Sequence, residues 1–247
     1  MLFEIPIILL VSFFIVAVIY SSSGFGGGSS YLAILALFSI AFLDIRMIAL
    51  ICNVVVVSGS SIVFYKSGQL KLNKSIGLII LSIPMAFLGA SLGISESIFF
   101  ILLGCTLLFT AILMFSSIDI FPQIKTGFVS HLFIGGAIGF LSGLVGIGGG
   151  IFLAPILYLG KWDNGKVIAA TCALFILVNS IAGISGQIYG NGLPENLTLI
   201  FPLGITVLLG GIIGSKISIK FLSAEKIKYI TALLIMIVAI RLLIKYL

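Results

Sequence analysis

Apolar positions along the chain gather in long runs instead of alternating with polar ones, a pattern typical of membrane-spanning helices. The runs cover residues 2–20, 30–43, 45–65, 75–94, 97–116, 127–144, 151–160, 166–189, 197–215 and 226–244. An α-helix needs about 20 residues to cross the hydrocarbon layer. The pattern therefore predicts an all-α, polytopic transmembrane protein, with partial or re-entrant helices at the shortest runs, 30–43 and 151–160.

Composition excludes a water-soluble domain. Of 247 residues, 61% are hydrophobic and 8% are charged, against about 25% charged in soluble domains, and the mean hydropathy is +1.38. Cys52, Cys105 and Cys172 fall within apolar runs without metal-ligand spacing, so we expect small buried apolar side chains. Glu4 stands where a signal peptide has a basic region, and we expect a first membrane segment there.

The chain carries two glycine-rich segments of nearly the same sequence. Residues 24–28 read GFGGG, and residues 146–150 read GIGGG, 122 positions further on. An internal match at half the chain length indicates a duplicated unit. We predict two transmembrane repeats of about five segments each, residues 1–116 and 127–247, joined by a linker at 117–126.

Basic residues indicate how the repeats are oriented, because cytoplasmic loops hold an excess of Lys and Arg. If every run reverses direction, ten of the thirteen basic residues share one side. These are Lys66, Lys71, Lys74, Lys125, Lys161, Lys166, Lys216, Lys220, Lys226 and Lys228. Arg46, Arg241 and Lys245 lie on the other side. An odd number of runs per half then predicts that the second repeat is inverted.

The triple glycines predict breaks in the helices. Each glycine costs a helix about 1 kcal/mol relative to alanine, and non-helical backbone at membrane depth must be buried in protein or line a wet cavity. The helix that starts after a break presents free N–H groups and a positive dipole end, which suit an anion. Candidate substrate-binding residues are therefore Gly26, Gly27, Gly28, Ser29, Ser30, Gly148, Gly149 and Gly150.

Close helix packing is the alternative role for glycine in a membrane. We favour it for two pairs spaced four apart within otherwise continuous runs, Gly89 with Gly93 and Gly210 with Gly214.

Neutral polar residues within the runs are further candidates. Asn53 and Ser60 are seven apart, on nearly one helical face, and Thr171 and Asn179 lie within about 80° of each other. Such amides and hydroxyls suit an oxyanion without a fixed charge, and they equally suit hydrogen bonds between helices. Asn53, Thr171 and Asn179 are included as candidate binding residues, with both roles open.

Charged and titratable residues give weaker indications of a binding role. His131 is expected at the membrane interface, with proton coupling as the alternative role. Asp44 and Arg46 flank the start of a run, where we expect a surface ion pair or interfacial anchoring. No carboxylate stands at the centre of a run, so the sequence names no proton relay. It also carries no protease, hydrolase, nucleotide-binding or metal motif, which argues against an enzyme, a cofactor, a bound metal or a nucleic-acid partner.

Residues 146–155 read GIGGGIFLAP and follow GFLSG at 139–143. Together with the earlier glycine segment, this motif resembles the TauE/SafE sulfite exporter family over essentially the whole chain. The resemblance implies a secondary transporter of sulfite, organosulfonates or related sulfur-containing anions, with the glycine segments and Pro155 near the site. The first copy departs from the motif, with Ala33 at the position that matches Pro155.

The function expected is alternating-access transport of a small anion between two inverted halves, with a passive anion channel as the alternative. The partners expected are the anion and the lipid bilayer, and a homo-oligomer stays open. We expect a multi-pass protein of the plasma membrane, which is the inner membrane if the source is Gram-negative.

Overall fold

The structure is a computed structural model that describes residues 6–36, 38, 40–92, 95–115, 127–193 and 198–221, and separate positions between 223 and 244. Within these ranges every regular element is an α-helix: α1 Ile7–Ser22, α2 Gly28–Leu35, α3 Phe42–Lys66, α4 Leu72–Ser91, α5 Glu96–Phe115, α6 Phe128–Val145, α7 Gly150–Leu159, α8 Gly165–Asn191 and α9 Ile200–Phe221. Helices α3, α4, α6, α8 and α9 are long and apolar enough to cross a membrane. The prediction of an all-α polytopic membrane protein is confirmed. The predicted linker at 117–126 lies outside the described residues.

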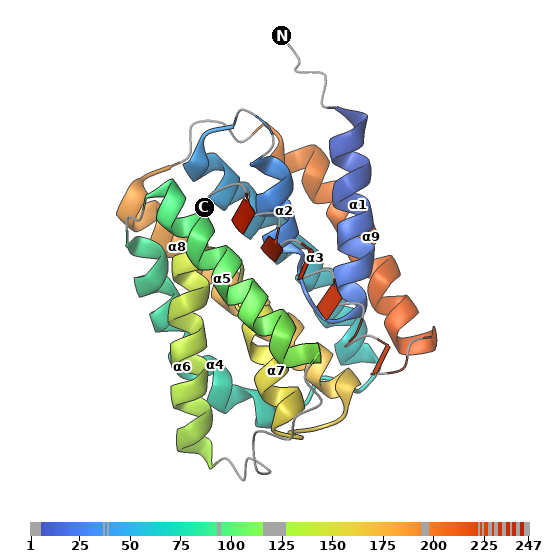
Figure 1. Cartoon of the computed structure of the whole chain (residues 1–247). Helices are drawn as coiled ribbons and strands as arrows, with labels where there is room; N and C mark the ends of the chain where they lie inside the picture. Colours follow the sequence, from blue (N-terminus) through green and yellow to red (C-terminus); the bar gives the residue numbers. More distant parts are fainter. Residues whose placement is uncertain are drawn as a thin grey trace.

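Two helices are much shorter than a bilayer crossing. Helices α2 and α7 have 8 and 10 residues, or about 12 and 15 Å at 1.5 Å per residue, against a hydrocarbon layer of about 30 Å. Trp162, just beyond α7, donates its indole N–H to His131 Nε2 in the first turn of α6 at 3.1 Å. Helices α6 and α7 therefore form a hairpin that returns to the end where it began, and α1 and α2 do the same at the opposite end (Figure 1).

Helices α3 and α8 form the centre of the structure and pack against each other. Around them, α1 packs on α9, and α6 packs on α4. The second contact is close because Gly135, Gly139 and Gly143 of α6 lie against the backbone of α4, where a Cβ would collide. Gly89 lies in the same way against α6, and Gly210 and Gly214 against α1, which supports close packing for these glycines. Gly93 lies outside the described residues.

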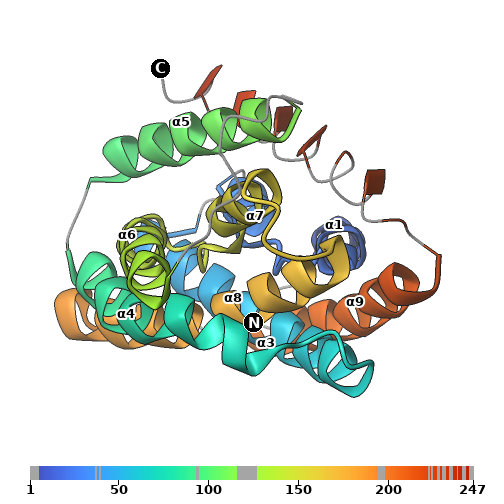
Figure 2. The ribbon, with the colours of Figure 1, turned by 90° about the horizontal axis from the view of Figure 1, so that it is seen from below.

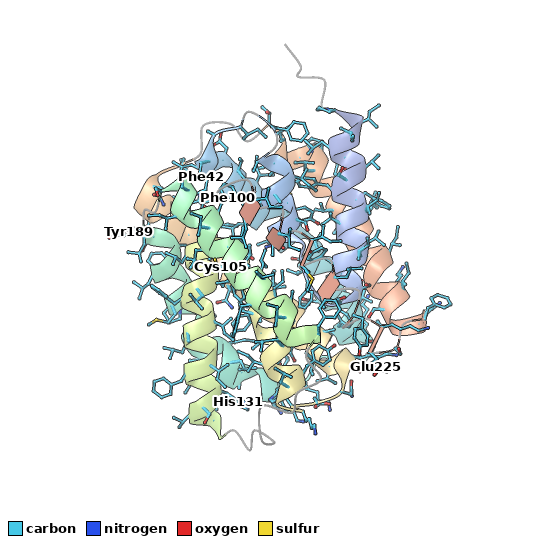
Figure 3. The ribbon with its side chains drawn as sticks, viewed as in Figure 1. Phe42, Phe100, Cys105, His131, Tyr189 and Glu225 are labelled. Carbon is cyan, nitrogen blue, oxygen red and sulfur yellow. The ribbon has the colours of Figure 1, made fainter. Side chains whose placement is uncertain are left out.

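The outer faces of the bundle are apolar, as a lipid-facing surface requires. Helix α5 lies along one side of it (Figure 2), and Cys105 is exposed on this helix (Figure 3). The expectation that all three cysteines are buried was therefore wrong for Cys105, whose apolar surroundings would be lipid. Cys52 and Cys172 are buried, on α3 and α8.

Basic residues meet at the end of the bundle where α4 and α8 begin. Lys71 and Lys74 both pair with Asp163, at 3.0 and 2.7 Å, and Lys166 Nζ donates to the Ile219 carbonyl at 2.9 Å. Burial alone would raise the pKa of the Asp163 carboxyl, but hydrogen bonds from Lys74, the Asn164 N–H and Lys71 lower it to about 2. This carboxylate stays ionised at physiological pH and ties α4 to the loop before α8.

Candidate binding site at the two helix breaks

The first break lies between α1 and α2, and glycine is required there for two reasons. Gly24 and Gly27 have φ values of 78° and 91°, in the left-handed region that other residues rarely adopt. Gly26 and Gly28 lie directly against the side chain of Asn53, where a Cβ would overlap its amide atoms. The amide of Asn53 on α3 thus rests on the bare peptide backbone of this break.

The second break repeats this arrangement between α6 and α7. Gly146, Gly148 and Gly149 have φ values of 68°, 78° and 80°. A Cβ at Gly148 would lie 2.6 Å from Ser180 Oγ, and one at Gly149 would lie 2.7 Å from Ser142 Cβ. The backbone of this break is therefore in close contact with hydroxyl-bearing residues of α8 and α6.

Asn53 joins the two breaks. Its Nδ2 donates to the carbonyl oxygen of Ile147, in the middle of the second break, at 3.2 Å, while the same side chain packs on Gly26 and Gly28 of the first. Asn53 is fully buried, and its Oδ1 has no protein partner among the described residues. The structure therefore brings Gly26, Gly28 and Asn53 of the first half together with the 146–149 segment of the second half.

The helices that follow the breaks start at this same place. Gly27 and Gly149 are the N-terminal residues before α2 and α7, and within the described part of the chain no side chain caps either helix. The first N–H groups of a helix have no acceptor within it. Helix α2 lies above α7 in Figure 1 and directly behind it in Figure 2, which looks along the vertical axis. Two positive helix ends thus face a common region at mid-depth.

Hydroxyl groups gather on one side of this region. Ser29, Ser30 and Tyr20 are buried at the start of α2 and the end of α1, and Ser30 Oγ donates to Tyr20 Oη at 2.9 Å. The positions 122 residues after Ser29 and Ser30 are Ile151 and Phe152. The lining of the two breaks is therefore polar at α2 and apolar at α7.

The remaining three predicted residues, Thr171, Asn179 and Pro155, make other contacts. The hydroxyls of Thr171 and Ser75 are 3.2 Å apart and join α8 to α4. Asn179 donates to the Phe175 carbonyl of its own helix at 2.8 Å, and its Oδ1 has no partner within the described residues. Pro155 is buried inside α7. Asn179 stays available to a ligand, while Thr171 serves as an interhelical contact in this structure.

The candidate binding residues did not include Ser142, Ser180 or, above all, Arg46. Asp44 and Arg46 were expected at the surface, but both are buried, with 5% and 1% exposure. Both lie near the start of α3, which begins at Phe42, and the packing of the bundle around this end of the helix buries them. Arg46 Nη2 lies 3.5 and 3.4 Å from the carbonyl oxygens of Gly143 and Leu144 at the end of α6. The signal that could have found it is its spacing of seven residues from Asn53, which places both on one face.

Among the residues that the structure describes, no group of three His, Cys, Asp or Glu side chains could hold a metal ion. The chemistry on offer is that of N–H groups, hydroxyls, amides and one guanidinium, which are donors for an anion.

Comparison with known proteins identifies the family. Residues 8–242 match the family described as sulfite exporter TauE/SafE. A "probable membrane transporter protein" of Sinorhizobium fredii is 34% identical over 242 residues, covering 95% of this chain and 97% of the relative. One of Methanocaldococcus jannaschii is 38% identical over 95 residues, covering 34% of this chain and 35% of the relative. No solved structure matches the chain significantly. The polytopic helical fold, the family match and the full-length relative lead to one conclusion: the chain belongs to the sulfite exporter TauE/SafE family of membrane transporters.

Proposed function

We propose that this membrane transporter is a secondary carrier of small sulfur-containing anions, such as sulfite or an organosulfonate, and that it works by alternating access between two inverted halves. The observation that carries the proposal is the meeting of the two breaks at Asn53, which contacts glycines of one and donates to Ile147 of the other. A pocket made from both halves is where an alternating-access carrier holds its substrate.

Anion binding is supported by the donors around the breaks. The N–H groups at the starts of α2 and α7 point toward mid-depth, and Ser29 and Ser30 add hydroxyls at the first of them. Anions at a helix start are stabilised by both the free N–H groups and the dipole. The free Oδ1 of Asn53 could accept a hydrogen bond from a protonated anion such as hydrogensulfite, because it has no partner among the described residues.

Inversion of the second half is supported by the course of the chain. The start of α1 lies at the top of Figure 1, whereas His131, in the first turn of α6, lies at the bottom of Figure 3. The packing is also exchanged between the halves, since α1 contacts α9 and α6 contacts α4. We further propose a plasma-membrane location with the basic end, marked by Lys71 and Lys74, in the cytoplasm.

The test is transport by the purified protein in liposomes. Uptake of sulfite, sulfate, thiosulfate, small sulfonates and carboxylates is measured against concentration, with proton and sodium gradients imposed in turn. A carrier saturates and shows counterflow, while linear flux without counterflow would establish a channel instead. Failure to transport or bind any of these anions would reject the proposal.

A glycine variant tests the site within the same assay. Gly149→Ala places a Cβ at a φ of 80°, against Ser142 and Phe175, and we expect at least a tenfold loss of transport. Gly204→Ala is the matched control, because nothing lies within 4 Å of its Cβ position. Full activity of a folded Gly149→Ala variant would count against a site at the second break.

A further inference from the structure

Two buried hydroxyl groups lie at the second break without a hydrogen-bond partner. Ser142, in the last turn of α6, is 1% exposed, and Ser180 of α8 is fully buried. Within the described part of the chain, neither Oγ has a hydrogen-bond partner. Burial of a hydroxyl without a partner costs free energy, and native proteins leave few polar groups in this state. The packing of the fold gives no reason for either of them.

Serine inside a helix commonly bonds to a carbonyl of the preceding turn. This protein follows that pattern at Ser58, Ser82 and Ser215, whose hydroxyls donate to carbonyl oxygens three or four residues earlier at 2.6, 2.9 and 2.7 Å. Ser142 and Ser180 also lie within helices, yet their hydroxyls do not make this bond. Both hydroxyls are therefore left free to bond to another group.

These two side chains contact the backbone of the second break. A Cβ at Gly148 would lie 2.6 Å from Ser180 Oγ, and a Cβ at Gly149 would lie 3.1 Å from Ser142 Oγ. The other atoms nearest to these positions belong to two apolar residues of α8. The hydroxyls thus reach adjacent residues of the break from two different helices.

Free N–H groups follow directly in the chain. Phe152 and Leu153 both donate to the Gly149 carbonyl, at 3.1 Å each. The first N–H groups of α7, at Gly150 and Ile151, have no acceptor within the helix. Three helices, α6, α7 and α8, therefore supply hydrogen-bond donors to one short stretch of backbone.

The corresponding hydroxyls of the first half are already bonded. The positions 122 residues before Ser142 and Ser180 are Tyr20 and Ser58. Tyr20 accepts a hydrogen bond from Ser30 at 2.9 Å, and Ser58 donates within its own helix at 2.6 Å. The free pair of hydroxyls is thus a feature of the second break, and the likeness of the two glycine segments does not account for it.

From this arrangement we propose that Ser142 and Ser180 bind the substrate and, with the first N–H groups of α7, recognise the three oxygens of an SO3 group. The proposal rests on the proposed function and deepens it, because sulfite and organosulfonates share this group. Donors from three helices suit three oxygens that point in three directions. A planar carboxylate has only two oxygens and would leave a buried hydroxyl unbonded, which a site of this kind penalises.

The anion reaches these donors when the halves move apart in the proposed mechanism, since both hydroxyls are enclosed in this structure.

The first measurement is the stability of Ser142→Ala and Ser180→Ala in detergent without an anion. Each change removes a buried hydroxyl that has no partner among the described residues, so we expect the midpoint of thermal unfolding to stay the same or rise. A fall in the midpoint, or failure to fold, would show that the hydroxyls serve the fold and would overturn the proposal.

The second measurement is sulfite uptake by proteoliposomes, with methanesulfonate and acetate as competitors. These two anions share a methyl group and a single negative charge and differ in the SO3 and carboxylate groups. We expect acetate to compete about tenfold more weakly than methanesulfonate in the unaltered protein. Each serine variant should raise the KM for sulfite and the inhibition constant of methanesulfonate about tenfold, and that of acetate by less than about threefold.

Ser215→Ala is the matched control for transport. Its hydroxyl is also buried, but it bonds to the Gly211 carbonyl of its own helix at 2.7 Å, so this variant should keep all three values.

Two results of the competition would reject the proposal. They are equal competition by acetate and methanesulfonate in the unaltered protein, and an equal loss of affinity for both anions in the serine variants. An unchanged KM for sulfite in both variants would reject it as well. Failure of the unaltered protein to transport any anion would instead reject the proposed function, so the two failures are distinguishable.

Discussion

Asn53 is the side chain on which the contact between the breaks depends. Its amide donates to Ile147 across the interface between the two halves, and it fits there only because positions 26 and 28 lack a Cβ. The bond is fully buried, so neither partner can turn to water if the other is removed. Asn53 thus explains why positions 26 and 28 must be glycine, and it connects the first break to the second.

Asn53→Ala should lower both stability and transport. Loss of the amide leaves the Ile147 carbonyl without its donor, and an unsatisfied buried group costs about 1–3 kcal/mol in the free energy of unfolding. The midpoint of thermal unfolding in detergent and the initial rate of sulfite uptake measure the two effects. Ser60→Ala is the control on the same face of α3, where the hydroxyl bonds mainly to Val56 of its own helix at 3.1 Å. Equal effects of the two variants would contradict a special role for Asn53.

Helix pairs, and not single helices, are the units that hold the breaks in place. Helix α6 is fixed to α4 through a row of glycines, and α1 is fixed to α9 in the same way. Without a hydrophobic force between helices in lipid, close backbone contact is what stabilises such pairs. Each broken helix of one half is therefore supported by a continuous helix of the other.

Gly139→Ala tests this contact. A Cβ at Gly139 would collide with the Ser82 backbone, so α6 and α4 must separate, and we expect the midpoint of thermal unfolding to fall by several degrees. Gly183→Ala is the matched control in α8, because its Cβ would meet Leu50 at an ordinary 3.5 Å. Alanine favours a helix over glycine by about 1 kcal/mol, and the control should be neutral or stabilising. A stabilising effect of Gly139→Ala would show that the contact is looser than described.

Helices α1 and α6 run in opposite directions, which supports the proposed inverted arrangement of the two halves. The two hairpins enter from opposite ends and stop near the same depth, which places two short helices end to end around one region (Figures 1 and 2). In the proposed mechanism, a site of this kind would open toward either side when one half moves relative to the other.

Cysteine labelling tests this arrangement in intact cells. In a Cys105→Ser background, Ile7→Cys marks the start of α1 and Gly127→Cys the residue before α6, where an added Cβ meets nothing within 4 Å. We expect a membrane-impermeant thiol reagent to label Ile7→Cys from outside and Gly127→Cys only after the membrane is opened. Labelling of both from the same side would rule out inverted halves.

Hydropathy and glycine spacing were sufficient for much of this fold, because both act locally. Apolar runs indicate membrane helices wherever they pack, and triple glycine weakens a helix whatever surrounds it, so the helical class and the breaks at 24–28 and 146–150 followed from the chain alone. The inverted duplication and the binding roles of the candidate residues stay predictions.

Partners across helices could not be read in the same way, because they depend on rotation and depth in the packed bundle. Thr171 and Asn53 are both neutral polar residues within apolar runs. In the structure Thr171 forms a hydrogen bond with Ser75, whereas Asn53 donates to Ile147 of the second break. Arg46 resembles a residue at the edge of an apolar run and lies near the start of α3, but the packing of the bundle leaves its side chain only 1% exposed. Only the packed bundle brings the Arg46 guanidinium and the Asn53 amide to the backbone of the second half, because these contacts join residues about a hundred positions apart in the chain.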